Sequence, residues 1–176
     1  MTTMLEDGDL RLRPARLPDD VALAVPWYHD PEVLHFSEGE GTKPYDAAMV
    51  TRMFQYLADR GELYIVEFLQ DGAWLPIGDA TLMTDSVPIV IGNAHYRSRG
   101  LGSRVLDLLI TRAVALGWTR LVVGRVFVDN ARSLRMFERA GFRKATLVKE
   151  DDGRDAWRLT LDLTDRLIPE EAATSD

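Results

Sequence analysis

The sequence has no cysteine and little histidine. Because cysteine is absent from all 176 residues, disulfides, thiolate metal ligands and cysteine nucleophiles are excluded. The three histidines, His29, His35 and His95, match no metal-binding spacing, so we expect no metal site. Positive charge is also scarce, since 21 lysines and arginines stand against 28 acidic residues, for a formal net charge of −7. A general nucleic-acid binder has the opposite balance, and we expect no nucleic-acid partner.

Long apolar runs are missing too. Residues 1–14 lack the apolar core of a signal peptide, and no apolar run approaches the roughly 20 residues that a membrane-spanning helix requires. We therefore expect a cytoplasmic protein without a membrane partner. The length of 176 residues suits one ordinary domain. The acidic composition is compatible with cationic substrates such as amines, and it serves solubility equally well.

The apolar periodicity predicts an α/β (α+β) chain that folds as a single domain over residues 1–166, followed by a disordered tail at 167–176. The element order indicates a mixed, mostly antiparallel central sheet of about six to seven strands, flanked by helices. In the first strand, alternation places Arg11 and Arg13 on a solvent face. Strands are expected at 9–15, 62–69, 74–83, 86–92, 120–127, 143–150 and 156–163, and helices within 17–39 and at 45–61, 101–117 and 129–142.

A positively charged turn with two glycines, RSRGLG at residues 97–102, joins an apolar strand to a helix. The first turn of a helix presents unpaired N–H groups and the positive end of its dipole. Gly100 and Gly102 let an anion approach the backbone, and Arg97 and Arg99 add positive charge. The turn therefore predicts a site for a phosphate-bearing cofactor. Taken alone, it also fits a tight connection with solvated arginines.

Two common classes of phosphate site do not match this turn. A P-loop requires G-x-x-x-x-G-K-[ST], and the sequence contains no such string. A dinucleotide-binding fingerprint requires a third glycine where the chain has Val105, and its acidic partner is missing.

The pattern R-x-x-G-x-G at Arg97–Gly102 resembles a signature of the GNAT superfamily of acyl-CoA-dependent N-acetyltransferases. A second signature follows after one helix and one strand. It consists of Asn130, a helix, and the ending Phe137-Glu-x-x-Gly-Phe142. The N-terminal region is similar to the branch that holds ribosomal-protein N-terminal acetyltransferases and aminoglycoside 6'-N-acetyltransferases. The resemblance implies acetyl-CoA as the cofactor, and it adds a homodimer as an expected assembly.

The resemblance also implies how the cofactor lies. The fourth and fifth strands, at 86–92 and 120–127, would splay apart and hold the pantetheine arm, and the glycine turn would hold the pyrophosphate. In many family members a tyrosine in the last helix protonates the leaving thiolate, and here that position is phenylalanine. The implied cofactor-binding residues are Val90, Ile91, Arg97, Ser98, Arg99, Gly100, Leu101, Gly102, Ser103, Asn130, Ser133 and Phe137.

The implied reaction moves an acetyl group from acetyl-CoA to a primary amine. The acceptor would be a small polyamine or aminoglycoside-like molecule, or a protein N-terminus. The amine must lose a proton before it attacks, and Asp79 is the candidate base because a cleft raises the pKa of an inward-facing carboxylate. An ion pair of Asp79 with an arginine is the structural alternative.

Candidate acceptor-binding residues lie in and around the first helices, where aromatic rings beside carboxylates suit a cationic amine. They are Trp27, Tyr28, Phe36, Glu38 and Glu40. Two alternatives stay open. The chain could be a non-catalytic acyl-CoA-binding or sensing module, which Phe137 favours, or a nucleotide-binding domain of another type.

Overall fold

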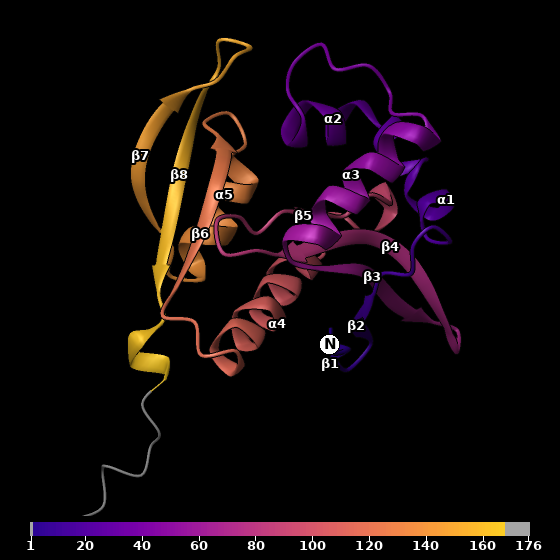
Figure 1. Ribbon diagram of the computed structural model, residues 1–176, viewed down its shortest axis with the longest axis horizontal. Coiled ribbons are helices and arrows are strands. Elements are labelled where there is room, and N and C mark those ends of the chain that lie inside the picture. Colours follow the sequence, from indigo (N-terminus) through magenta and orange to yellow (C-terminus); the bar gives the residue numbers. More distant parts are fainter. Residues whose placement is uncertain (1, 168–176) are drawn as a thin grey trace, which may run out of the picture.

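A computed structural model of the protein describes residues 2–167 and arranges them as two antiparallel sheets with helices around them. Figure 1 shows the smaller sheet and α5 on one side, the larger sheet with α1–α3 on the other, and α4 between them. The tail expected at 167–176 lies outside the described residues, apart from its first residue. Within the described part, every helix is too short or too polar to cross a bilayer.

The larger sheet has the strand order β1-β2-β3-β4-β5, and all its pairs are antiparallel. The turn between β3 and β4 has Asp71 and Gly72 at positive φ values of 52° and 78°, as a tight hairpin requires. Its strands are β1 (Leu5–Asp7), β2 (Leu10–Pro14), β3 (Glu62–Gln70), β4 (Ala73–Leu82) and β5 (Ile89–Val90).

The smaller sheet has the order β6-β8-β7, with β6 at Arg120–Phe127, β7 at Arg143–Lys149 and β8 at Asp155–Asp162. Strand β6 pairs with β8 and not with β5, although only one helix separates β5 from β6 in the chain. The expected central sheet is therefore divided between its predicted fourth and fifth strands, which confirms the splay.

The helices begin and end close to the predicted positions. Asp46 caps the start of α3, and Asn130 caps the start of α5. The N-terminal helical region is broken at Pro26 and Asp30, and a short 3-10 turn, Trp27–His29, lies between its two helices. The helices are α1 (Val21–Ala24), α2 (Pro31–Ser37), α3 (Ala47–Arg60), α4 (Leu101–Ala115) and α5 (Ala131–Arg139).

Two apolar clusters cover opposite faces of the larger sheet. Tyr64 and Val66 of β3 pack in the cluster that α4 and α5 share with both sheets. Leu63 and Ile65 alternate with them and pack in the cluster beneath α1–α3. Since both faces of β3 are covered, its central stretch Leu63–Val66 contains no charged residue.

One prediction for the strand expected at 9–15, which is β2 in the structure, was wrong. Arg13 is only 8% exposed, whereas alternation placed it on a solvent face. Its guanidinium is paired with Asp20 at 3.0 Å and with Glu67 of β3 at 3.0 Å, and this pairing makes its burial tolerable.

Candidate active site

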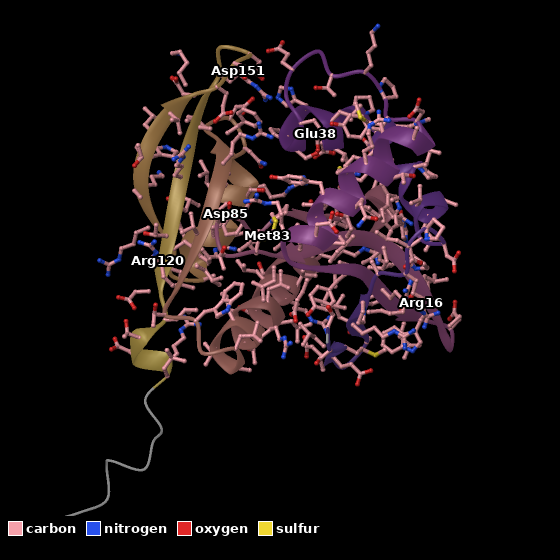
Figure 2. All side chains as sticks on the ribbon, in the orientation of Figure 1. Arg16, Glu38, Met83, Asp85, Arg120 and Asp151 are labelled. Carbon is pink, nitrogen blue, oxygen red and sulfur yellow. The ribbon has the colours of Figure 1, made fainter. Side chains whose placement is uncertain are left out.

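A cleft with a volume of about 900 Å³ opens where β5 and β6 diverge. Its walls come from α2, β5, the turn at 96–103, β6 and α5. In Figure 2, Glu38 lies beside α2, and Met83 and Asp85 lie between β6 and α3. A Cβ on Gly124 of β6 would lie 3.4 Å from the Asp85 carbonyl oxygen. The loop between β4 and β5, which contains Asp85, therefore lies against β6.

Helix α4 begins at the cleft without a side-chain cap. Gly100 precedes the helix with φ 75°, and no side chain accepts a hydrogen bond from the first turn. The N–H groups of Leu101, Gly102 and Ser103 have no partner within the helix, and all three residues line the cleft. A Cβ on Gly102 would lie 3.1 Å from the Met136 sulfur of α5, so the two helices are close here. The first turn of α4 thus offers backbone donors to an anion.

The two arginines of the turn have different surroundings. Arg97 donates to the Ile91 and Gly92 carbonyl oxygens, each at 2.8 Å, and pairs with Asp30 at 2.8 Å and Glu32 at 2.9 Å. It lines the cleft, but its charge is already balanced. Arg99 lies over the Tyr96 ring beside His95 and is outside the cleft lining. Ser98, at φ 59°, lines the cleft.

Most of the positive charge at the cleft comes from arginines that the sequence reasoning missed. On α5, Arg132, Arg135 and Arg139 have the i, i+3, i+7 spacing of one helix face, a signal that could have identified them. Although the chain is acidic, its cleft is basic. The charged residues of the lining are Arg97, Arg125, Arg132, Arg135, Arg139 and Arg158 against Glu32 and Glu150.

The other predicted cofactor residues lie along the cleft. Val90 and Ile91 line it on the β5 side, and Ser133 lines it on α5. The Asn130 side chain accepts the Ser133 N–H at 3.2 Å, so it caps α5 at the cleft wall. Phe137 is 5% exposed and packs edge-to-face on Phe142. The structure therefore brings together both signatures.

Asp79 is buried beside a phenol and not beside an arginine. The Tyr28 hydroxyl donates to its two carboxylate oxygens at 3.2 and 3.1 Å, and Asp79 is 2% exposed. Burial raises the pKa of Asp79 to about 7; the Tyr28 hydrogen bond lowers it, and the charge of Glu38 adds to the rise. Asp79 lies opposite Val90 in the β4–β5 register. The carboxylate is thus behind the cleft wall, with a pKa suited to proton transfer near neutral pH.

A second phenol and carboxylate lie next to this pair. The Tyr45 ring stacks on Tyr28 with centroids 5.8 Å apart, and its hydroxyl donates to Glu38 at 2.7 Å. Burial and the Glu38 carboxylate raise the pKa of Tyr45, while the positive charge of Arg125 lowers it. Tyr45 therefore lies close to both Glu38 and Arg125.

The remaining predicted acceptor residues are dispersed. Phe36 lines the cleft. Trp27 is 7% exposed and packs against Gly92, away from the lining. Glu40 is exposed, and its N–H donates to Asp152 at 2.9 Å. Of the five candidates, Phe36 alone lines the cleft within the part of the chain that the structure describes.

Comparison with protein families gives a match over residues 9–143 to the family described as Acetyltransferase (GNAT) domain. No curated protein sequence gives a significant match to the chain.

Solved structures share the fold at low sequence identity. A domain from Methanocaldococcus jannaschii superposes with a TM-score of 0.73 at 17% identity, covering 88% of this chain and 100% of that one. The aminoglycoside acetyltransferase AAC(6')-Ib, in complex with ribostamycin and coenzyme A, gives 0.73 at 21% identity, covering 96% and 99%. RimL, a ribosomal L7/L12 alpha-N-protein acetyltransferase in complex with coenzyme A, gives 0.75 at 15% identity, covering 92% and 99%.

Proposed function

The chain belongs to the GNAT acetyltransferase family, and on this basis we propose that it is an acetyl-CoA-dependent N-acetyltransferase acting on a primary amine. The acetyl group passes directly to the amine in a ternary complex. The observation that carries the proposal is the uncapped first turn of α4, which faces a basic cleft between two diverged strands.

The cleft offers the cofactor both positive charges and free backbone hydrogen-bonding groups. The N–H groups of residues 101–103 and the arginines of α5 would hold the phosphates. The backbone of Val90 and Ile91 would hold the pantetheine arm in the gap that the strands leave. A side chain on Gly102 would occupy the approach to these donors, and this residue has none.

Bound acetyl-CoA supplies an acetyl thioester. The protein must then take a proton from the amine. We assign this role to Asp79, which is held by the Tyr28 hydroxyl and would receive the proton through water, because its carboxylate lies behind the cleft wall. Phe137 has no proton to donate. None is required, because a thiol with an ordinary pKa of about 8.5 leaves readily as a thiolate.

Two assays test the proposal. Calorimetry should show micromolar binding of acetyl-CoA and coenzyme A, and no comparable binding of ATP or NAD. Release of free thiol from acetyl-CoA should then depend on an added amine. Absence of acetyl-CoA binding would refute the proposal and favour a nucleotide-binding domain of another type.

The pH profile tests the role of Asp79. Its carboxylate must be ionised to accept a proton, so kcat/KM should rise as pH increases through its pKa of about 7. Asp79→Asn should lower kcat about 100-fold or more and leave acetyl-CoA binding unchanged. The matched control Asp85→Asn changes a surface carboxylate paired with Arg60, and its profile should stay that of the wild type. An Asp79→Asn variant with wild-type kcat would remove Asp79 from the mechanism.

A non-catalytic acyl-CoA-binding or sensing module is the second candidate, and Phe137 favours it. It predicts the same calorimetric result with no thiol release for any amine. Turnover with one amine excludes it.

A further inference from the structure

The smaller sheet turns one arginine, Arg158, into the cleft. Along β8, successive side chains alternate between the two faces. Leu159 packs in the core that α5 shares, so Arg158 and Ala156 lie on the opposite face. Arg158 is exposed and lines the cleft.

A bulge in β6 places a second arginine beside Arg158. Val123 pairs with Leu159 and Val126 pairs with Trp157, so residues 124–125 of β6 lie opposite Arg158 alone. The Arg125 guanidinium lies 5.1 Å from the Phe127 ring and donates to the Ser37 carbonyl oxygen at 2.5 Å. Phe127 pairs with Ala156 and so shares the face of Arg158. Arg125 therefore reaches the end of α2, and Arg158 lies on the same face of the smaller sheet as Phe127.

The charge of these arginines is not fully balanced. Arg125 reaches Glu150 only at 3.5 Å. Among residues 2–167, Arg158 has no carboxylate within ion-pair distance, although acidic residues outnumber basic ones in the chain. By contrast, each of the following arginines has a carboxylate partner: Arg11, Arg13, Arg60, Arg97, Arg104, Arg112, Arg132 and Arg154. Arg158 is thus available to an anion in the cleft.

Acidic groups lie behind the neighbouring part of the cleft wall. Glu38 accepts the Tyr45 hydroxyl, and its charge acts on Asp79. The charge of Arg125 acts on Tyr45, which places the acidic and basic groups close together. A molecule with an amino group and a carboxylate matches both ends of this arrangement. A polycation matches only one end and is repelled by the other.

We propose that the acceptor is an amine whose molecule carries a carboxylate near the amino group, and that Arg158, with Arg125 beside it, binds this carboxylate. The inference rests on the proposed acetyl transfer. In that reaction the C–N amide bond forms, the C–S thioester bond breaks, the thiolate leaves with its electron pair, and the amine proton passes to the base. The carboxylate takes no part in these bond changes and only positions the amine. Among the acceptor classes that the sequence leaves open, this disfavours the small polyamine and the aminoglycoside-like molecule.

Matched acceptors test the charge preference by thiol release. L-Methionine is compared with L-methioninamide, and Ala-Asp-Ala-amide with Ala-Lys-Ala-amide, so the two pairs separate a free amino acid from an acidic peptide N-terminus. Spermidine and kanamycin serve as polycations. The carboxylate member of at least one pair should exceed its partner in kcat/KM by about 10-fold or more.

Variants then test the binding residue. Arg158→Ala should raise KM for the preferred carboxylate acceptor by about 10- to 100-fold with little change in kcat, and should leave the amide partner unaffected. Arg158→Lys should recover part of this loss. Arg143→Ala removes an exposed arginine on β7 outside the cleft and should match the wild type. The dissociation constant of acetyl-CoA should be the same in all three variants.

Three results would overturn the inference. They are a higher kcat/KM for spermidine or kanamycin, an equal effect of Arg158→Ala on both members of a pair, and turnover of the amide and lysine partners without turnover of the carboxylate acceptors. Failure of the proposed function looks different, because then either acetyl-CoA does not bind or no amine of any class, spermidine and kanamycin included, releases thiol.

Discussion

Helices α3 and α4 begin in opposite ways. Before α3, Asp46 has extended backbone geometry, and its carboxylate accepts the Met49 N–H at 2.8 Å. Before α4, Gly100 is left-handed, and no side chain caps the first turn. Both helices start with unpaired N–H groups and a positive dipole end. Helix α3 pairs its donors with an anion of its own chain, while α4 leaves its donors available to the proposed cofactor.

The surroundings of the first turns of α3 and α4 also differ. The start of α3 is exposed, with Ala47 and Ala48 on the surface. The start of α4 opens into the cleft beside the arginines of α5. A cap stabilises a helix by about 1 kcal/mol, so its omission in α4 costs stability that a phosphate bound as proposed would restore. Under this proposal, the start of α3 serves folding and the start of α4 serves binding.

The largest expected effect comes from filling the approach to α4. Gly102→Trp should weaken acetyl-CoA binding by about 100-fold or more, because the indole occupies the space of the phosphates and presses on Met136. Ala48→Trp makes the same change at the equivalent position of α3, where the side chain is exposed, and binding should be unchanged. Calorimetry of both variants decides. Equal binding by Gly102→Trp and the wild type would mean that the cofactor lies elsewhere.

A smaller effect should follow when α4 is given an anion of its own. Gly100→Asp places a carboxylate beside the donors of the first turn and should weaken acetyl-CoA binding about 10-fold, since like charges repel. Gly100→Asn matches aspartate in size and in its tolerance of this positive φ, but it carries no charge. Its affinity should stay within about twofold of the wild type. Equal losses in both variants would assign the effect to strain.

The smallest effect on the cofactor should come from removing the cap of α3. Asp46→Ala should lower the free energy of unfolding by about 1 kcal/mol and Tm by about 2–4 °C. Acetyl-CoA affinity should not change. Thermal unfolding and calorimetry measure both quantities, and a loss of affinity would show that α3 contributes to the site.

Features that depend on neighbouring residues were predictable from the sequence. Asn130 and Gly100 mark helix starts because caps and left-handed turns are local requirements. The Asp71-Gly72 hairpin follows for the same reason. The three-residue strand β1 is too short for periodicity to reveal it.

Features that depend on distant partners were not predictable. The charge of Arg97 is balanced by Asp30 and Glu32, which lie 67 and 65 residues away in the chain. Asp79 meets Tyr28 across 51 residues, and alternation alone cannot name that partner. Arg158 faces the cleft only because β8 lies beside a bulge in β6. Strand register and helix packing decide these contacts, and local sequence patterns predict neither.

The most direct measurement follows the backbone N–H signals of both helix starts by NMR while coenzyme A is added. The amides of Leu101, Gly102 and Ser103 should shift strongly and saturate with the calorimetric dissociation constant. The amides of Ala47, Ala48 and Met49 should stay in place, because Asp46 already caps α3. Saturable binding of coenzyme A that leaves the α4 amides unshifted would contradict the assignment of these donors to the cofactor.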